Sequence, residues 1–137
     1  TTAQAQALSS AQLAALTTTN LAAMETDDVR ALRTNQIQAF TTTQVAQGLS
    51  TDQVANLTTA QVAALTTAQL AQGMSTGQVL ALNSEQVKAL TTAQVAALRT
   101  NQVAALETDE IAALKTAQLV ALTTTQVAQG LTSDQVV

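Results

Sequence analysis

Residues 90–98 read Leu-Thr-Thr-Ala-Gln-Val-Ala-Ala-Leu, and a variant of this phrase, Leu-Arg-Thr-Asn-Gln-Val-Ala-Ala-Leu, follows at once over residues 98–106. The rest of the chain consists of further variants of the same phrase. A short tandem period is typical of repeat proteins, in which neighbouring units stabilise one another. We number the residues of each unit so that Leu90 is at position 1, Thr91 at position 2, Gln94 at position 5 and Val95 at position 6.

The chain contains seventeen units, the last one truncated, and we expect residues 1–137 to form a single repeat array. Three units have nine residues instead of eight, because Gly48, Gly73 or Gly130 is inserted before the next leucine or methionine. We interpret these glycines as helix C-cap residues that allow a left-handed turn. Because the sequence stops at Val137 within a unit, we expect the array to be a fragment of a longer repeat protein. Counted from position 2, the units begin at Thr1, Ser9, Thr17, Glu25, Arg33, Thr41, Ser50, Thr58, Thr66, Ser75, Asn83, Thr91, Arg99, Glu107, Lys115, Thr123 and Thr132.

The composition excludes several classes of function. The 137 residues include one aromatic side chain, Phe40, and no cysteine or histidine, and the net charge is -4. The sequence has no basic patch for the phosphates of nucleic acid and no apolar run of about 20 residues, so we expect neither a nucleic-acid partner nor a membrane span. The lack of cysteine excludes disulfides and thiolate metal sites, and it is compatible with an extracellular protein.

A hydroxyl residue recurs at position 3 and predicts where each helix starts. Position 3 is Thr or Ser in every unit, whereas position 2 also accepts Glu, Arg, Asn and Lys. A side-chain oxygen just before an apolar segment is typical of a helix N-cap, where it accepts a hydrogen bond from the N–H group two or three residues on. We therefore predict that Thr92 is the N-cap of its unit and that Thr91 is a replaceable linker residue.

The spacing of the apolar residues favours helices over strands. In a continuous helix, eight residues overshoot two turns by about 80°, so that no face of a long rod would stay apolar. Position 6 and the position 1 that follows it are three residues apart, which places them on one face of a helix but on opposite faces of a strand. We predict an all-α fold, a tight α-solenoid of short capped helices of five or six residues with eight- or nine-residue repeats. A β-solenoid is the alternative.

Neighbouring units are expected to share one apolar core. Isolated helices shorter than about 12 residues are marginal in water, so each unit must be stabilised by its neighbours. Position 7 admits Arg30, Gln38 and Lys88, so we expect it to face solvent. The expected core residues are those at position 6 (Leu13, Leu21, Val29, Ile37, Val62, Val95, Ile111 and Leu119) and at position 1 (Leu8, Leu32, Phe40, Leu57, Leu82 and Leu114).

Position 5 carries a polar constraint. It is glutamine in all units except those that contain Asn20, Asp28 and Glu110. Short helices leave most of their terminal N–H and C=O groups without intrahelical partners, and burying such a group unpaired costs about 1–3 kcal/mol. We therefore expect the position-5 amide to bridge these groups, by closing its own first turn or by reaching an adjacent coil. The alternative is a solvated, helix-forming glutamine.

The sequence offers no candidate catalytic, cofactor-binding or metal-binding residue. Without histidine and cysteine, the usual general bases, nucleophiles and soft metal ligands are missing, so we expect no enzymatic activity and no cofactor. Hard oxygen ligands for Ca²⁺ occur in two clusters, at residues 25–28 (Glu-Thr-Asp-Asp) and 107–110 (Glu-Thr-Asp-Glu). We interpret both clusters as ordinary acidic residues at helix N-termini and predict no metal site.

A family resemblance is carried by residues 89–106, Ala-Leu-Thr-Thr-Ala-Gln-Val-Ala-Ala-Leu-Arg-Thr-Asn-Gln-Val-Ala-Ala-Leu. This array resembles the Ala/Thr/Gln-rich short tandem repeats of large bacterial surface or secreted adhesin-like proteins. The resemblance covers the whole chain and implies an extracellular or bacterial cell-surface location, with a role as a stalk, spacer or filament component. It supplies no catalytic residues.

The expected partners are neighbouring repeats or copies of the same chain, in a homo-oligomer or fibre. An array without polar capping units exposes surface onto which another unit can pack. The alternative function is that of an ice- or surface-binding repeat protein that uses its regular array of threonines.

Overall fold

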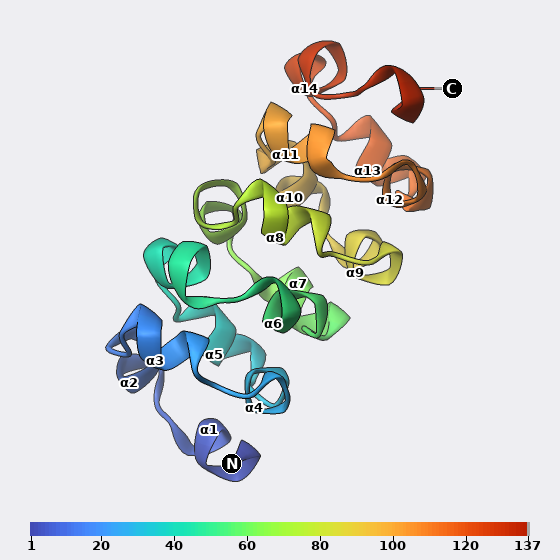
Figure 1. Ribbon diagram of the computed structural model, residues 1–137. Coiled ribbons are helices and arrows are strands. Elements are labelled where there is room, and N and C mark those ends of the chain that lie inside the picture. Colours follow the sequence, from blue (N-terminus) through green and yellow to red (C-terminus); the bar gives the residue numbers. More distant parts are fainter. Residues whose placement is uncertain (137) are drawn as a thin grey trace.

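The computed structural model describes residues 1–136, which form short helices joined by extended linkers and contain no β-strand (Figure 1). This result confirms the all-α prediction and excludes the β-solenoid. Two π-helical turns, η1 (Gln44–Gly48) and η2 (Gln69–Gly73), and a terminal 3-10 turn, η3 (Ser133–Gln135), interrupt the series of α-helices. The α-helices are α1 (Thr2–Ala7), α2 (Ser10–Ala14), α3 (Thr18–Ala22), α4 (Thr26–Arg30), α5 (Thr34–Gln38), α6 (Thr51–Ala55), α7 (Thr59–Ala64), α8 (Thr76–Leu80), α9 (Ser84–Ala89), α10 (Thr92–Ala97), α11 (Thr100–Ala105), α12 (Thr108–Ala113), α13 (Thr116–Val120) and α14 (Thr124–Gln129).

The helices stack in three columns. Each unit contributes one helix, and the helix pairs in extensive contact are all three units apart in the sequence. The chain therefore completes about one superhelical turn in every three units and advances by one layer. The result is an elongated stack with the two termini at opposite ends (Figure 1). The columns are α1–α4–α6–α8–α11–α14, α2–α5–α7–α9–α12–η3 and α3–η1–η2–α10–α13.

The helices start one residue earlier than predicted, and the assignment of Thr92 as an N-cap is wrong. The N-cap of α10 is Thr91, whose Oγ1 accepts a hydrogen bond from the backbone N–H of Gln94 at 3.1 Å. Thr92 is the first residue of the helix. Within residues 1–136 the only position-3 hydroxyl in a side-chain hydrogen bond is that of Ser84, which donates to Glu110. Hydrogen bonding therefore does not explain why position 3 is always Thr or Ser.

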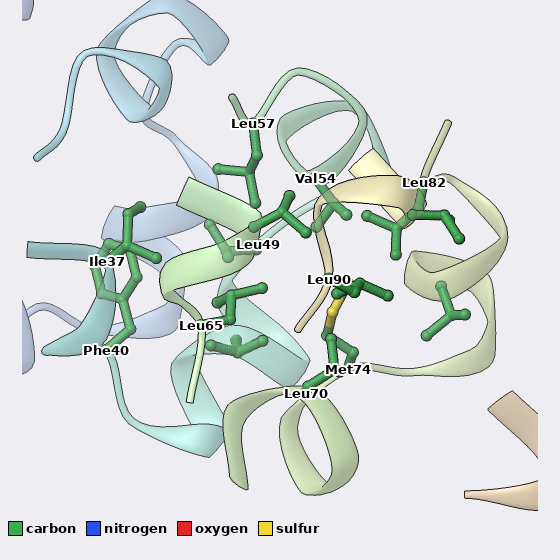
Figure 2. Close-up of a cluster of buried hydrophobic side chains, with 14 of the residues drawn as sticks. Ile37, Phe40, Leu49, Val54, Leu57, Leu65, Leu70, Met74, Leu82 and Leu90 are labelled. Atoms are coloured by element: carbon green, nitrogen blue, oxygen red, sulfur yellow. The ribbon is translucent and has the colours of Figure 1, made fainter. Parts of the chain in front are cut away.

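Apolar side chains at positions 6 and 1 form one continuous core along the stack. Leu21 and Ile37 at position 6 are completely buried, and Leu90 at position 1 is nearly so. The cluster of buried side chains extends from Ala5 to Leu114, and Figure 2 shows part of it, contributed by successive coils. Burial of each such side chain stabilises the fold by about 1.5–3 kcal/mol. This packing offsets the cost of nucleating helices that are too short to be stable alone.

Two of the predicted core residues are less buried than expected. Leu119 is 45% exposed, because α13 is the last helix of its column within residues 1–136. Leu8 is only partly buried, since it follows α1 in the first layer of the stack. The other predicted core residues are buried, as expected. Position 1 is therefore buried only where a layer precedes the unit, and position 6 only where a layer follows it, since Leu13 and Leu21 of the first layer are completely buried.

The inserted glycines widen a turn, and the prediction that they adopt a left-handed conformation is wrong, although Gly130 is the C-cap residue of α14 as predicted. No residue among 1–136 has a positive φ. The extra residue at Gly48 is accommodated by the π-helical turn η1, in which the N–H of Leu49 donates to the carbonyl of Gln44, five residues earlier, at 3.1 Å. The same type of bond forms at the other two insertions. A Cβ atom at Gly48 would lie 3.3 Å from the Cα of Thr18 in α3. Close packing, not backbone conformation, therefore requires glycine here.

Candidate functional site

The position-5 glutamines form a buried polar array, which we call the glutamine seam. These side chains are at most 3% exposed. A buried polar group is tolerated only when it is hydrogen-bonded, so each member must have partners within the fold. The members of the seam are Gln36, Gln44, Gln53, Gln61, Gln69, Gln78, Gln86, Gln94, Gln102, Gln118 and Gln126.

Gln94 illustrates the bonds of the seam. Its Oε1 accepts a hydrogen bond from the Thr91 N–H at 2.7 Å, and together with the bond from its own N–H to the Thr91 hydroxyl this forms a capping box. Its Nε2 donates to the carbonyl oxygens of Val62 at 2.9 Å and Leu65 at 2.7 Å. One side chain therefore closes the first turn of its own helix and binds the coil four units earlier. Both parts of the expectation for position 5 are confirmed.

The acceptor carbonyls lie at the corner that leads into the helix of the preceding layer. Leu65 is the C-cap residue of α7, and the chain continues from it into η2, on which α10 is stacked. Carbonyls at a helix C-terminus lack intrahelical partners, and leaving one buried and unpaired costs about 1–3 kcal/mol. The seam therefore supplies the hydrogen bonds that the tight corners would otherwise lack. Within residues 1–136, no buried side-chain nitrogen or oxygen is without a partner.

The seam also explains why position 2 accepts residues that cannot cap a helix. Arg99 and Lys115 have no side-chain acceptor, yet each is the N-cap residue of a regular helix. The N–H of Arg99 donates to Oε1 of Gln102 at 2.9 Å, and the N–H of Lys115 donates to Oε1 of Gln118 at 2.8 Å. The glutamine thus supplies half of the capping box by itself, and it holds the helix start in place when position 2 varies.

Three units have another residue at position 5. Asn20 and Asp28 belong to the first units, which have no coil four units before them in this chain. Glu110 of α12 does have such a coil, but its Oε1 instead accepts a hydrogen bond from Oγ of Ser84 at 3.1 Å. Within residues 1–136 no side-chain amide reaches the carbonyl of Val79 or Leu82, which correspond to the acceptors of the other seam bonds. The seam is therefore interrupted at α12.

The two acidic clusters lie at helix N-termini, as interpreted from the sequence. Asp27 and Asp28 are in the first turn of α4, and Asp109 and Glu110 are in the first turn of α12. Negative charge is favoured there by the helix dipole. In the described part of the chain, no group of three or more acidic, histidine or cysteine side chains is arranged to hold a metal ion. No helix among residues 1–136 has both the length and the apolar character needed to cross a membrane.

Comparison with known families identifies the repeat. The ALTTAQ repeat matches residues 21–59, 72–100 and 103–137, which together make up more than half of the chain. The chain belongs to the ALTTAQ repeat family. No curated protein and no solved structure matches it. The family match supports the tandem-repeat part of the resemblance noted above. In this chain the ALTTAQ phrase occurs in full at residues 64–69 and 89–94, and it ends on the seam residues Gln69 and Gln94.

The spacing of residues in the ALTTAQ phrase indicates the correct N-cap, although the constant hydroxyl at position 3 points to a different residue. A capping box has Ser or Thr followed three residues later by Glu or Gln. Thr91 and Gln94 have this spacing, whereas Thr92 and Gln94 are only two residues apart. The carbonyl partners of the seam have no comparable signal, because backbone acceptors are present at every residue of the sequence.

Proposed function

We propose that this ALTTAQ repeat array is a non-enzymatic structural module, a rod-like stalk or spacer in an extracellular or bacterial cell-surface protein. The observation that supports this role is that the extensive helix contacts connect units three apart, so that each layer packs only on adjacent layers. In such a stack, each further group of three units adds length and leaves the cross-section unchanged.

The glutamine seam supports the same role, because it joins successive layers by a repeated set of bonds. Gln61 donates to the Leu32 carbonyl at 2.8 Å, as Gln94 does to that of Leu65 at 2.7 Å. Buried polar networks that are fully hydrogen-bonded give a rigid and unique packing. A stalk built in this way keeps its direction over many layers, and its length is set by the number of units.

Solution scattering tests the elongated shape. Seventeen units in three columns form between five and six layers, and at about 8–10 Å per layer the stack is about 50 Å long. A compact protein of 137 residues would have a radius of gyration of about 14 Å. We expect a larger radius of gyration for the monomer separated by size-exclusion chromatography.

A lengthened array makes this test sharper. A second copy of residues 17–98 inserted after Leu98 keeps the repeat in register, because the sequence from residue 99 onward resembles that from residue 17 onward. The insertion raises the number of units from seventeen to twenty-seven. We expect the maximum dimension to increase by about 1.6-fold, whereas a compact protein of the same size would grow by only about 1.2-fold. An increase in the maximum dimension of only about 1.2-fold would refute the spacer role.

The threonine array gives less support to ice or surface binding. Consecutive units belong to three different columns, so the threonines of neighbouring units lie in different columns and do not form one uninterrupted row. The Thr91 hydroxyl is moreover engaged in the capping box of α10. We therefore favour the structural role over recognition of a crystalline surface.

A further inference from the structure

The interruption of the seam at α12 puts a carboxyl group in the place of an amide, and we propose that protonation of Glu110 closes this joint between two layers. In the ionised form, the Glu110 side chain is bonded to Ser84, as in the structure, and the seam is open. In the protonated form, the side chain takes the place of a seam glutamine and joins α12 to the corner at Leu82. This joint is therefore sensitive to pH, whereas the joints made by glutamine are not.

A seam residue needs an acceptor and a donor at the end of one side chain. Oε1 of Gln102 accepts a hydrogen bond from the Arg99 N–H at 2.9 Å. Its Nε2 donates to the carbonyl oxygens of Leu70 at 2.9 Å and Met74 at 2.8 Å. An ionised carboxylate can only accept, whereas a protonated carboxyl group has one oxygen that accepts and one O–H group that donates. Because glutamate and glutamine have the same length, only the protonated form of Glu110 meets the requirement.

The partners of the missing bonds are present at α12. Within residues 1–136 the Glu107 N–H has no acceptor, and no N–H or side-chain group donates to the Leu82 carbonyl. The Val79 carbonyl already accepts a hydrogen bond from the Leu82 N–H at 3.1 Å, so the single proton of the acid is directed to the Leu82 carbonyl. The closed joint thus has two bonds. The Glu107 N–H donates to one carboxyl oxygen, and the O–H of the other donates to the Leu82 carbonyl.

The joint lies inside the stack. The helix α12 packs on α9 of the preceding layer and is followed in its column by η3, and Ile111 and Leu114 of the same unit are buried. Ser84 is the first residue of α9, and Leu82 precedes it by two positions. The two alternative partners of Glu110 are therefore close together in the chain, so a rotation of the side chain is enough to exchange one for the other.

No ion pair holds Glu110 in its ionised form. Within residues 1–136 its carboxylate contacts no base, and Lys88 of α9 is paired with Glu85 at 2.9 Å. The corner at residues 79–82 contains no titratable side chain. Neutralisation of Glu110 therefore breaks no ion pair. The other charged groups of α12, of its N-cap and of the elements packed against it are Glu107, Asp109, Glu85, Lys88 and Asp134.

The acid at position 5 belongs to a unit that occurs twice. Residues 107–111 (Glu-Thr-Asp-Glu-Ile) repeat the pattern of residues 25–29 (Glu-Thr-Asp-Asp-Val), ten units earlier. Position 5 is acidic in both copies, at Asp28 and Glu110, and in no other unit. An acid in the seam is thus a recurring feature of the array.

The direction of the pH effect follows from the bonds. The closed joint binds a proton that the open joint lacks, so closure and protonation favour each other. Glutamate side chains take up a proton at about pH 4.3, so the joint should be open at neutral pH and should close on acidification. The inference rests on the proposed stalk only for its effect on shape, since a rod bends more easily at an open joint. Closure itself needs only two layers in contact.

Hydrogen exchange at the Glu107 amide tests closure in the full 137-residue chain. The quantity compared is the protection factor, the exchange rate of an unstructured peptide of the same sequence divided by the observed rate at the same pH. We expect the protection factor of the wild type to rise by about tenfold or more between about pH 7 and about pH 3, because the amide gains a hydrogen bond. Circular dichroism at each pH establishes that the helix content is unchanged.

Two substitutions give the limits of the measurement. Glu110→Gln supplies a donor at every pH, so the Glu107 amide should be protected at both pH values. Glu110→Ala supplies neither donor nor acceptor and should leave this amide unprotected at both. The wild type should resemble the alanine variant at neutral pH and approach the glutamine variant in acid. The matched control is Asp109→Asn, which removes a charge from an exposed residue of the same turn and should keep the wild-type response.

Three results would overturn closure by protonation. They are equal protection of the wild-type amide at the two pH values, an equal rise in Glu110→Ala, and loss of the response in Asp109→Asn. The last two would show that the general loss of negative charge accounts for the protection. An elongated monomer in solution scattering would leave the stalk standing in each of these cases. A compact monomer would refute the stalk but would not alter the result of the exchange measurement.

Discussion

Gln94 shows why position 5 is restricted to one residue type. The carboxamide offers an acceptor for its own N-cap N–H and donors for the corner of the preceding layer. Glutamate has the same length but no donor when ionised, and asparagine is shorter by one methylene group. Aspartate is shorter and also lacks the donor. The three position-5 residues that are not glutamine, Asn20, Asp28 and Glu110, make no side-chain bond to a carbonyl of an earlier coil within residues 1–136.

Replacement of one seam residue tests its contribution to stability. Gln94→Met keeps the size of the side chain but removes its hydrogen bonds, which leaves the Val62 and Leu65 carbonyls without the amide that binds them. We expect the free energy of unfolding to fall by about 2–4 kcal/mol in urea denaturation followed by circular dichroism. The control Gln72→Met alters an exposed glutamine and should change stability by less than about 0.5 kcal/mol. Equal effects of the two substitutions would contradict a structural role of the seam.

The bridging role of Gln94 is predictable from the sequence. The residue types at positions 2 and 3 do not by themselves show whether Thr91 or Thr92 caps the helix. Short helices require partners for their end groups, and an almost constant glutamine is the side chain that can supply them. The constant hydroxyl at position 3 suggests a cap there, but constancy at this position does not reflect a capping bond. In the structure the cap is shared between positions 2 and 5, so position 2 can vary while the helix start remains fixed.

At the scale of the helical element, the inserted residues show how the array tolerates a change of length. A nine-residue unit places its extra residue in a wide turn, and the next helix begins in the same relation to its neighbours. The sequence marks these units clearly, since each insertion is a glycine. It does not reveal the reason for glycine, because the atoms that exclude a side chain belong to a helix about thirty residues earlier, such as α3 below Gly48.

Two glycine substitutions distinguish packing from backbone effects. In Gly48→Ala the new Cβ would lie 2.9 Å from Cδ2 of Leu21 and 3.3 Å from the Cα of Thr18, so we expect a loss of about 1–3 kcal/mol in the free energy of unfolding. In Gly77→Ala the nearest atom would be Oγ of Ser75 at 3.9 Å, and the helix α8 should gain about 0.5–1 kcal/mol. Urea denaturation measures both. A stabilised Gly48→Ala would show that α3 does not pack closely on η1.

At the scale of the whole molecule, the number of units per turn was beyond prediction from the repeat. An eight-residue period specifies one helix and one linker, but the angle between successive helices depends on how the corners pack. The seam bonds connect residues that are 28 to 33 positions apart in the sequence. This separation can be explained only by the stacking of the units in three columns. The solenoid class, the core positions and the bridging glutamine are predictable from periodicity and polar requirements, whereas the columns and the corners required the structure.

The interruption of the seam at Glu110 predicts where the stack opens most easily. Stability in a linear array propagates only through adjacent layers, so a missing set of bonds weakens one joint and not the whole. In Glu110→Gln, the new amide can accept a hydrogen bond from the Glu107 N–H and donate to the Val79 and Leu82 carbonyls, as other seam residues do. We expect the free energy of unfolding to rise by about 1–3 kcal/mol.

Hydrogen exchange at the Glu107 amide distinguishes a new seam bond in Glu110→Gln from the loss of a negative charge. In the wild type, the Thr91 N–H is bonded to its seam residue, whereas the Glu107 N–H has no acceptor within residues 1–136. The Glu107 amide should therefore exchange fast in the wild type and become protected in Glu110→Gln. Glu107→Gln removes the same charge from the exposed N-cap residue without adding a seam bond, so it should change stability by less than about 0.5 kcal/mol. If it stabilised the chain as much as Glu110→Gln, relief of charge repulsion and not repair of the seam would account for the gain.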